Sequence, residues 1–128
     1  MSIKKTCSEE LVEGLWTIEF GSNAGVFGSG VIVMRKGKIE GGDASYYYIG
    51  TYEEPNPEKP YPSVFRARIE AKPFLPGAES VFKTYNRSII LNLEGTFKDK
   101  DNAVAVGIPE GIPEMNLGIR MIRRSEAA

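Results

Sequence analysis

The sequence contains no histidine and a single cysteine, Cys7. The absence of histidine removes the commonest general base and the most frequent zinc ligand, and it excludes a haem held by histidine. One cysteine forms neither an internal disulfide nor a thiolate metal site. We interpret Cys7 as an incidental surface thiol, and we expect no metal, no cofactor and a reducing, cytoplasmic compartment.

An excess of charge and a long apolar run are also absent. Sixteen basic and 17 acidic residues give a net charge of −1, which provides no field to attract nucleic acid or an anionic membrane. No apolar run reaches the roughly 18 residues that a membrane span needs. Lys4 and Lys5 are not followed by the apolar stretch of a signal peptide. We therefore expect no direct nucleic-acid partner and no membrane contact.

Motifs that carry catalysis are incomplete. Residues 99–102 (Asp-Lys-Asp-Asn) begin like a calcium loop but lack its glycine and distal glutamate, so they favour a polar hairpin turn. Residues 41–43 (Gly-Gly-Asp) lack the Lys-Ser/Thr of a phosphate loop and favour a bulge or turn. The inward faces assigned below carry no Asp or Glu, so no carboxylate pair is placed for hydrolysis. We expect that the protein is not an enzyme.

What the chain does contain is alternation of apolar and polar side chains. Residues 13–20 show the period of two that is typical of a half-buried strand, with Trp16, Ile18 and Phe20 on one face. The same alternation recurs over residues 65–72 and 88–98. Further strands are expected over residues 26–34, 38–40, 45–52, 103–108 and 117–123.

These strands predict one all-β domain, an eight-stranded antiparallel up-and-down β-barrel. We place the domain at residues 13–124, between a flexible N-terminal tail (1–12) and a C-terminal tail (125–128). Residues 76–85 are the best candidate for a short helix, because apolar side chains recur there at three- and four-residue spacing.

The start of the first strand resembles that of lipocalin-type (calycin) barrels. Gly14 lies two residues before Trp16 and forms the pattern G-x-W. The resemblance implies that the tryptophan closes one end of the barrel and that an arginine of the last strand packs on it. Arg120, Arg123 and Arg124 are the candidates for that role.

The barrel interior is the first candidate binding site. Eight strands enclose just enough space for either packed side chains or one small ligand. A filled core and a cavity for an apolar guest, such as a fatty or aromatic molecule, both fit the expected lining. The inward-facing residues are Trp16, Ile18, Phe20, Tyr46, Tyr48, Phe65, Ile69, Leu91 and Leu93.

A proline-rich loop over residues 53–62 is the second candidate site. Four prolines in eight residues do not continue a sheet, so we expect a stiff, extended, exposed loop with an acidic start. Exposed loops on a rigid scaffold are where binding residues concentrate. Glu53, Glu54 and Glu58 are the partner-binding candidates; the alternative is a connection without a partner.

Several aliphatic residues are expected to face outward. Leu15, Ile32 or Val33, Ile90 and Ile122 fall on faces that should point outward. An apolar patch of this kind is usually covered by a partner, and a two-fold pairing of barrel walls is the simplest cover. The pattern predicts a homodimer.

Four stretches together resemble the GrlR family of small bacterial negative regulators of type III secretion: residues 14–20, 28–31, 37–43 and 46–50. The strongest match is G-x-x-x-G-G-D followed by an aromatic strand ending in Y-x-G. The resemblance implies a dimeric lipocalin-like barrel that binds a transcription activator and keeps it from DNA, through a surface Glu-Asp-Glu-Asp loop. Here the loop after Gly50 holds two adjacent glutamates in place of that four-residue motif.

Two hypotheses on function follow. The first is a non-enzymatic GrlR-like regulatory protein that binds a partner protein, such as a transcription activator, and represses it. The alternative is a lipocalin-like carrier or sensor of a small apolar ligand inside the barrel. The two activities are compatible, because a ligand inside the barrel could control binding of a partner.

Overall fold

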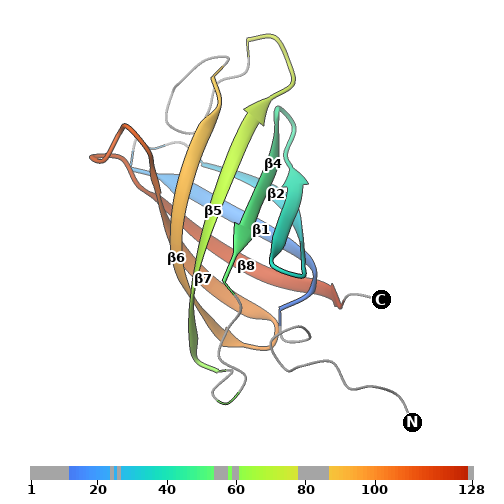
Figure 1. The fold of residues 1–128 in the computed structure, drawn as a ribbon. Coiled ribbons are helices and arrows are strands. Elements are labelled where there is room, and N and C mark those ends of the chain that lie inside the picture. Colours follow the sequence, from blue (N-terminus) through green and yellow to red (C-terminus); the bar gives the residue numbers. More distant parts are fainter. Residues whose placement is uncertain are drawn as a thin grey trace.

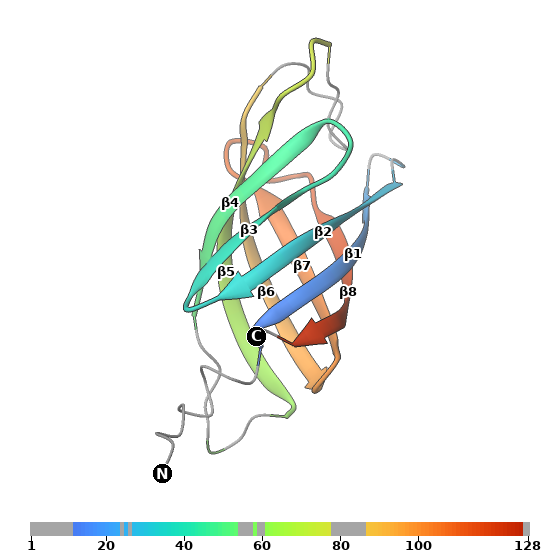
Figure 2. The same cartoon turned by 90° about the vertical axis from the view of Figure 1, so that its right-hand side faces the viewer.

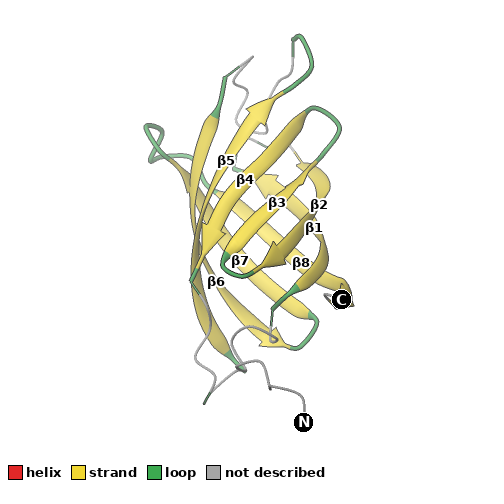
Figure 3. Ribbon diagram, turned by 45° about the vertical axis from the view of Figure 1, so that its right-hand side comes forward, coloured by secondary structure: helices red, strands yellow, loops and turns green. Residues whose placement is uncertain are grey.

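The computed structural model of the protein describes residues 12–23, 25, 27–53, 58, 61–77 and 87–126. In this part of the chain, eight strands form a closed barrel in chain order, each antiparallel to its neighbours (Figure 1). The strands are β1 (Gly14–Ser22), β2 (Phe27–Arg35), β3 (Lys38–Gly42), β4 (Tyr46–Tyr52), β5 (Ser63–Pro73), β6 (Ile89–Asp99), β7 (Asn102–Pro109) and β8 (Leu117–Glu126). Figure 3 shows that the described chain consists of strands and connections. The predicted eight-stranded antiparallel up-and-down barrel is confirmed.

The described edges of the barrel extend slightly beyond the expected domain limits. Val12, expected in the tail, is fully buried, and its carbonyl accepts the indole N–H of Trp16 at 2.9 Å. At the other terminus β8 continues to Glu126, which pairs with Gly14 of β1. The expected helix at 76–85 lies mostly outside the described residues, and the two described ones form part of a turn.

Two polar turns have the local chemistry that hairpins need. Between β2 and β3, Lys36 and Gly37 both adopt positive φ, at 50° and 79°, as a tight two-residue hairpin requires. Between β6 and β7, the carboxylate of Asp99 accepts the backbone N–H of Asp101 at 2.9 Å and also bonds the Asn102 side-chain amide. The Asp99 carboxylate therefore stabilises the β6–β7 turn through hydrogen bonds within it, as expected for a polar hairpin turn.

The connections fall at two opposite ends of the barrel (Figure 1, Figure 2). Connections β2–β3, β4–β5 and β6–β7, with the start of β1 and the end of β8, share what we call the closed end. Connections β1–β2, β3–β4, β5–β6 and β7–β8 share the open end. Tyr52 and Ser63, the strand ends on either side of the proline-rich segment, therefore lie at the closed end.

An aromatic plug fills the closed end. Phe97 stacks on Phe65 with ring centroids 4.4 Å apart and packs against Trp16 at 5.8 Å. Trp16 is fully buried, and the guanidinium carbon of Arg123 lies 5.5 Å from the centre of its ring. A cation over an indole face in a buried position stabilises both groups. Trp16, Phe65 and Phe97 therefore close the barrel at this end.

Of the three candidate arginines, Arg123 takes the role on Trp16. Its side chain is 2% exposed and donates to the carbonyls of Glu13 and Lys100, at 3.0 and 2.6 Å, and to the Asp101 carboxylate at 3.3 Å. The buried charge is thus hydrogen-bonded, as a buried guanidinium must be. Arg120 and Arg124 remain outside, where they bond Glu19 and Thr17.

Candidate functional site

A cavity of about 390 Å³ lies between the plug and the open end. This volume falls in the usual range of small-molecule sites and equals that of roughly a dozen waters at about 30 Å³ each. Trp16 and Phe65 lie in the plug instead of the cavity wall. The other seven predicted interior residues line the cavity: Ile18, Phe20, Tyr46, Tyr48, Ile69, Leu91 and Leu93.

Small residues on the inner wall leave this space open. β2 places Gly28 and Gly30 opposite the inward-facing Phe20 and Ile18. A Cβ atom added to Gly28 would lie 2.7 Å from the Phe20 ring, so the bare backbone lets this ring pack against β2 and project less far into the interior. Ala71 provides another short side chain on β5. The cavity therefore results from residue size along two strands.

Sequence patterns missed part of the lining. Ile32 was one of two candidates for the outer surface, but it is 3% exposed and lines the cavity, because β2 pairs it directly with the inward-facing Trp16. Directly opposite residues in an antiparallel pair share a face, and this fixes Ile32 inside and Val33 outside. The other additional apolar lining residues are Phe27, Ile39, Ala44, Ile89, Leu117, Ile119 and Met121.

Apolar side chains also lie exposed near the opening. Phe27 lines the cavity and is 80% exposed. Phe74 and Leu75, at the end of β5, are about half exposed, and the Phe74 N–H bonds the carbonyl of Ser45 at the β3–β4 turn. The apolar character of the interior thus continues to the rim.

Asp43 brings one charge to the cavity wall. Its Oδ1 accepts the backbone N–H groups of Ser45 and Tyr46, at 2.9 and 2.8 Å, and its Oδ2 accepts the hydroxyl of Tyr48. Among the described residues that line the cavity, it is the one with a formal charge. The expectation that Asp and Glu are absent from the interior is wrong here, because a turn residue bends back to the inward-facing Tyr48.

The sequence carries a local signal for this turn, an Asp placed two and three residues before the backbone N–H groups that it accepts. An Asp or Asn whose side chain bonds the backbone two and three residues ahead is a common turn device. The expectation of a bulge or turn over residues 41–43 is wrong for Gly41 and Gly42, which pair within β3, and only Asp43 lies in the β3–β4 connection. Alternation along strands gives no direction for a side chain in such a connection. The contact between Asp43 and Tyr48 therefore needed the structure.

The Tyr48 phenol is held in its protonated form. Burial, the hydrogen bond to Asp43 and the negative charge of Asp43 together raise the pKa of Tyr48 well above its ordinary value. The Tyr48 hydroxyl donates a hydrogen bond to Asp43 and keeps its proton. The Tyr48 oxygen and the Asp43 carboxylate therefore offer only acceptor sites to a molecule in the cavity.

The acidic loop residues lie far from this opening. Glu53 and Glu58 are exposed and belong to the β4–β5 connection at the closed end, while Glu54 lies outside the described residues. The backbone N–H of Glu53 bonds the carbonyl of Arg66 at 2.9 Å, which fixes the start of the loop on β5. The two candidate sites thus occupy opposite ends of the barrel.

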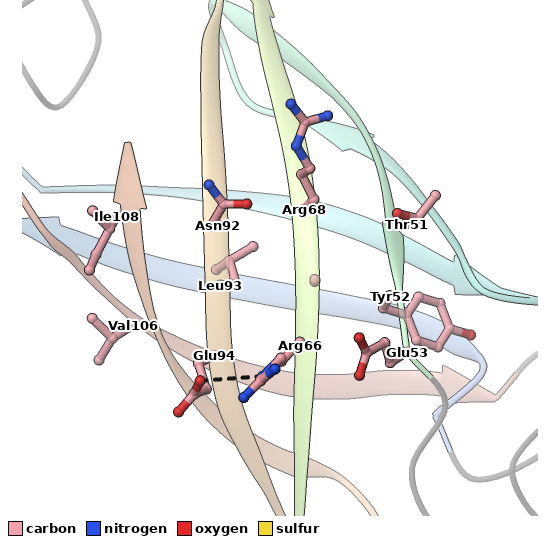
Figure 4. Close-up of a pocket in the computed structure, with 11 residues that line it drawn as sticks. Thr51, Tyr52, Glu53, Arg66, Arg68, Asn92, Leu93, Glu94, Val106 and Ile108 are labelled. Carbon is pink, nitrogen blue, oxygen red and sulfur yellow. Dashed lines mark ion pairs between the residues drawn. The ribbon is translucent and has the colours of Figure 1, made fainter. Parts of the chain in front are cut away.

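Glu53 borders a shallow groove on the outside of β4–β7, which we call the outer groove. Figure 4 shows Glu53 on the β4 side and Val106 and Ile108 on the β7 side, with the Arg66–Glu94 ion pair between them. This pair spans 3.5 Å. The outer groove is lined by Thr51, Tyr52, Glu53, Arg66, Ala67, Arg68, Asn92, Leu93, Glu94, Val106 and Ile108.

β7 has its smaller side chains inside the barrel and its larger ones outside. Its inward positions hold small residues, Ala103 and Ala105, which are 1% and 6% exposed. Its outward positions hold larger apolar ones: Val104, Val106 and Ile108 are 36%, 53% and 45% exposed. A strand with its larger aliphatic side chains outside is typical of a surface that meets a partner.

The expected dimer residues are divided between two environments. Leu15 and Val33 are cross-strand neighbours on the outside and are 38% and 42% exposed. Ile90 and Ile122 also lie on outward positions but are only partly exposed. The most exposed aliphatic residues of the outer wall include Val106 on β7, which that expectation had left out.

No protein-family model matches the chain, and no curated protein matches it either. The resemblance to the GrlR family rests on the sequence motifs and stays a prediction. The described part of the chain has no helix long and apolar enough to cross a bilayer. Within the same residues, no three acidic or cysteine side chains gather as a metal site would need.

Proposed function

We propose that this protein is a non-enzymatic binding protein that carries or senses a small, mainly apolar molecule inside the barrel. The observation that carries the proposal is the cavity of about 390 Å³, lined mainly by apolar side chains and open at one end. The aromatic plug closes the other end, so among the described residues the open end is the route by which a ligand enters. This interior is the candidate site that the described geometry defines most completely.

The expected affinity follows from apolar burial. Each methylene taken out of water contributes about 0.8 kcal/mol, which corresponds to about fourfold in Kd. A pocket that is already formed loses little conformational freedom on binding. A straight-chain ligand should therefore bind more tightly with each added carbon until the cavity is full.

The test is a fluorescence titration with the neutral apolar probe N-phenyl-1-naphthylamine, followed by displacement with straight-chain alcohols. We expect saturable binding of one probe per chain and alcohol affinities that rise about fourfold per methylene before levelling off. Alcohol affinities that keep rising with chain length, without levelling off, would indicate non-specific surface binding. The absence of saturable probe binding would contradict the proposal.

A second proposed function is that of a regulator which binds and represses a partner protein, such as a transcription activator. It is supported by the outer groove, where the exposed Glu53 lies on one side and the apolar Val106 and Ile108 on the other. A DNA-binding activator carries a basic surface, because it must neutralise phosphates. Glu53 suits the rim of such an interface, and the GrlR resemblance favours the same task.

Charge reversal tests this second function. Replacing Glu53 and Glu54 by lysine should weaken capture of the partner from the native cell extract, most strongly at low salt. Glu114→Lys, an exposed position at the open end, is the matched control. Equal capture by all three proteins would mean that the loop is only a connection.

We also propose that the protein is a cytoplasmic homodimer. The outward aliphatic residues of β7 support the pairing, because apolar patches of this kind are usually covered. Sedimentation at tens of micromolar should show a dimer, and Val106→Asp should shift it toward monomer. A wild-type monomer at this concentration would contradict the proposal.

A further inference from the structure

We propose that the molecule in the cavity carries a positively charged amine on an apolar body, and that Asp43 binds this amine at the open end. This inference rests on the proposed cavity function and adds the chemistry of the ligand head group. It comes from the charges and hydrogen-bonding groups of the cavity wall.

The charge inventory of the wall is one-sided. Asp43 lines the cavity, whereas Lys and Arg are absent from its described lining. Asp43 forms no ion pair with any described residue. The ion pairs between described residues lie on the outer surface of the barrel, apart from the one that the buried Arg123 makes with Asp101. A carboxylate beside an apolar space attracts a cation and repels an anion. An anionic head group, such as that of a fatty acid, is therefore disfavoured.

The hydrogen bonds in place point the same way. Oδ1 of Asp43 receives two backbone N–H groups, and Oδ2 receives the Tyr48 hydroxyl. A carboxylate has about four acceptor sites, so capacity remains for a further donor. The Tyr48 hydroxyl donates its hydrogen bond to Asp43, so its oxygen likewise retains acceptor capacity. A head group that donates several hydrogen bonds matches this arrangement, and an ammonium group donates three.

The carboxylate is fixed before a ligand arrives. Three donors hold Asp43 in one orientation, so little conformational freedom is lost on binding. Gly30 on β2, the strand that pairs with β3, has no side chain beside this pair. A Cβ atom there would lie 2.8 Å from the Gly42 carbonyl oxygen, 3.3 Å from the Tyr48 oxygen and 3.4 Å from the Asp43 Cβ. The bare backbone at Gly30 therefore keeps the acceptor pair free of crowding.

The test compares three molecules with the same apolar chain: n-octylamine, 1-octanol and octanoate. Each displaces N-phenyl-1-naphthylamine from the full-length protein at neutral pH and low salt. Hydrogen bonds to charged groups are stronger than neutral ones, so octylamine should bind about tenfold more tightly than octanol. Octanoate should bind more weakly than octanol.

Asp43→Asn keeps the acceptor oxygen that the turn needs and removes the charge. It should lower the affinity for octylamine about tenfold and leave that for octanol within about twofold. Glu114→Gln removes the same charge from an exposed position outside the cavity lining and should change neither value. Tyr48→Phe keeps the carboxylate and should retain the preference for the amine.

Two results would overturn the inference. One is equal displacement by octylamine and octanol from the wild-type protein. The other is an amine preference that persists in Asp43→Asn or disappears equally in Glu114→Gln. If the neutral probe and octanol still bind in either case, the cavity function stands and only the head-group chemistry is wrong. If the neutral probe does not bind at all, both proposals fail.

Discussion

Replacing Trp16 by alanine removes the largest fully buried side chain in the described part of the protein. Emptying an aromatic site in a core destabilises by about 3–5 kcal/mol. The contact with Arg123 adds about 1–2 kcal/mol because the guanidinium is buried. The Val12 carbonyl also loses its indole partner. These effects overlap, and we expect a loss of about 4–6 kcal/mol in the free energy of unfolding.

Such a loss is a large share of the roughly 5–15 kcal/mol that stabilises a typical domain. The assay is urea unfolding followed by far-ultraviolet circular dichroism, which does not depend on the tryptophan signal. Phe27→Ala is the matched control, because Phe27 is an aromatic that is 80% exposed. We expect the control to change stability by about 0.5 kcal/mol or less. A loss below about 1.5 kcal/mol for Trp16→Ala would refute the reasoning about the plug.

Three further outcomes follow from local contacts. Because the pKa of Tyr48 is raised in the folded state, the unfolded chain binds fewer protons above about pH 10, and stability should fall there by up to about 1.4 kcal/mol per pH unit. Tyr48→Phe should flatten this slope in urea unfolding between pH 9 and 11, and an unchanged slope would contradict the assignment. Gly41→Ala should destabilise strongly, because its Cβ would lie 2.1 Å from the Val31 carbonyl oxygen. Gly118→Ala, whose Cβ would meet only the Gly21 carbonyl oxygen at 4.0 Å, should be near neutral in the same assay. Arg123→Lys should lower stability by a few kcal/mol, since a lysine does not reproduce three hydrogen bonds from one planar group; an unchanged midpoint would exclude this role.

The fold could be predicted because its information is local. Alternation with a period of two marks each half-buried strand, and a turn such as Lys36-Gly37 needs only its own residues to form. The choice among three arginines could not be made in this way. Arg123 is buried because the register of β8 against β1 places it opposite Trp16, and register is a property of two strands together.

The candidate site was predicted in part for the same reason. Inward positions along strands were identified, but the division between plug and cavity depends on which side chains meet across the barrel. Asp43 belongs to a turn, where alternation assigns no face. β7 carried a readable signal, since its larger aliphatic residues alternate with Ala103 and Ala105, but the sequence alone does not say which set faces inward.

The central claim is that the barrel holds an apolar molecule in its interior, and filling the cavity tests it most directly. Ala71→Phe adds a phenyl ring to the cavity wall, and Val64→Phe adds the same ring to an outward position of the same strand, where Val64 is 66% exposed. The measurement is the Kd of N-phenyl-1-naphthylamine for the three proteins, with circular dichroism to verify the fold. We predict saturable binding to the wild type and Val64→Phe, weakened at least about tenfold in Ala71→Phe. Equal binding to all three proteins would contradict the account.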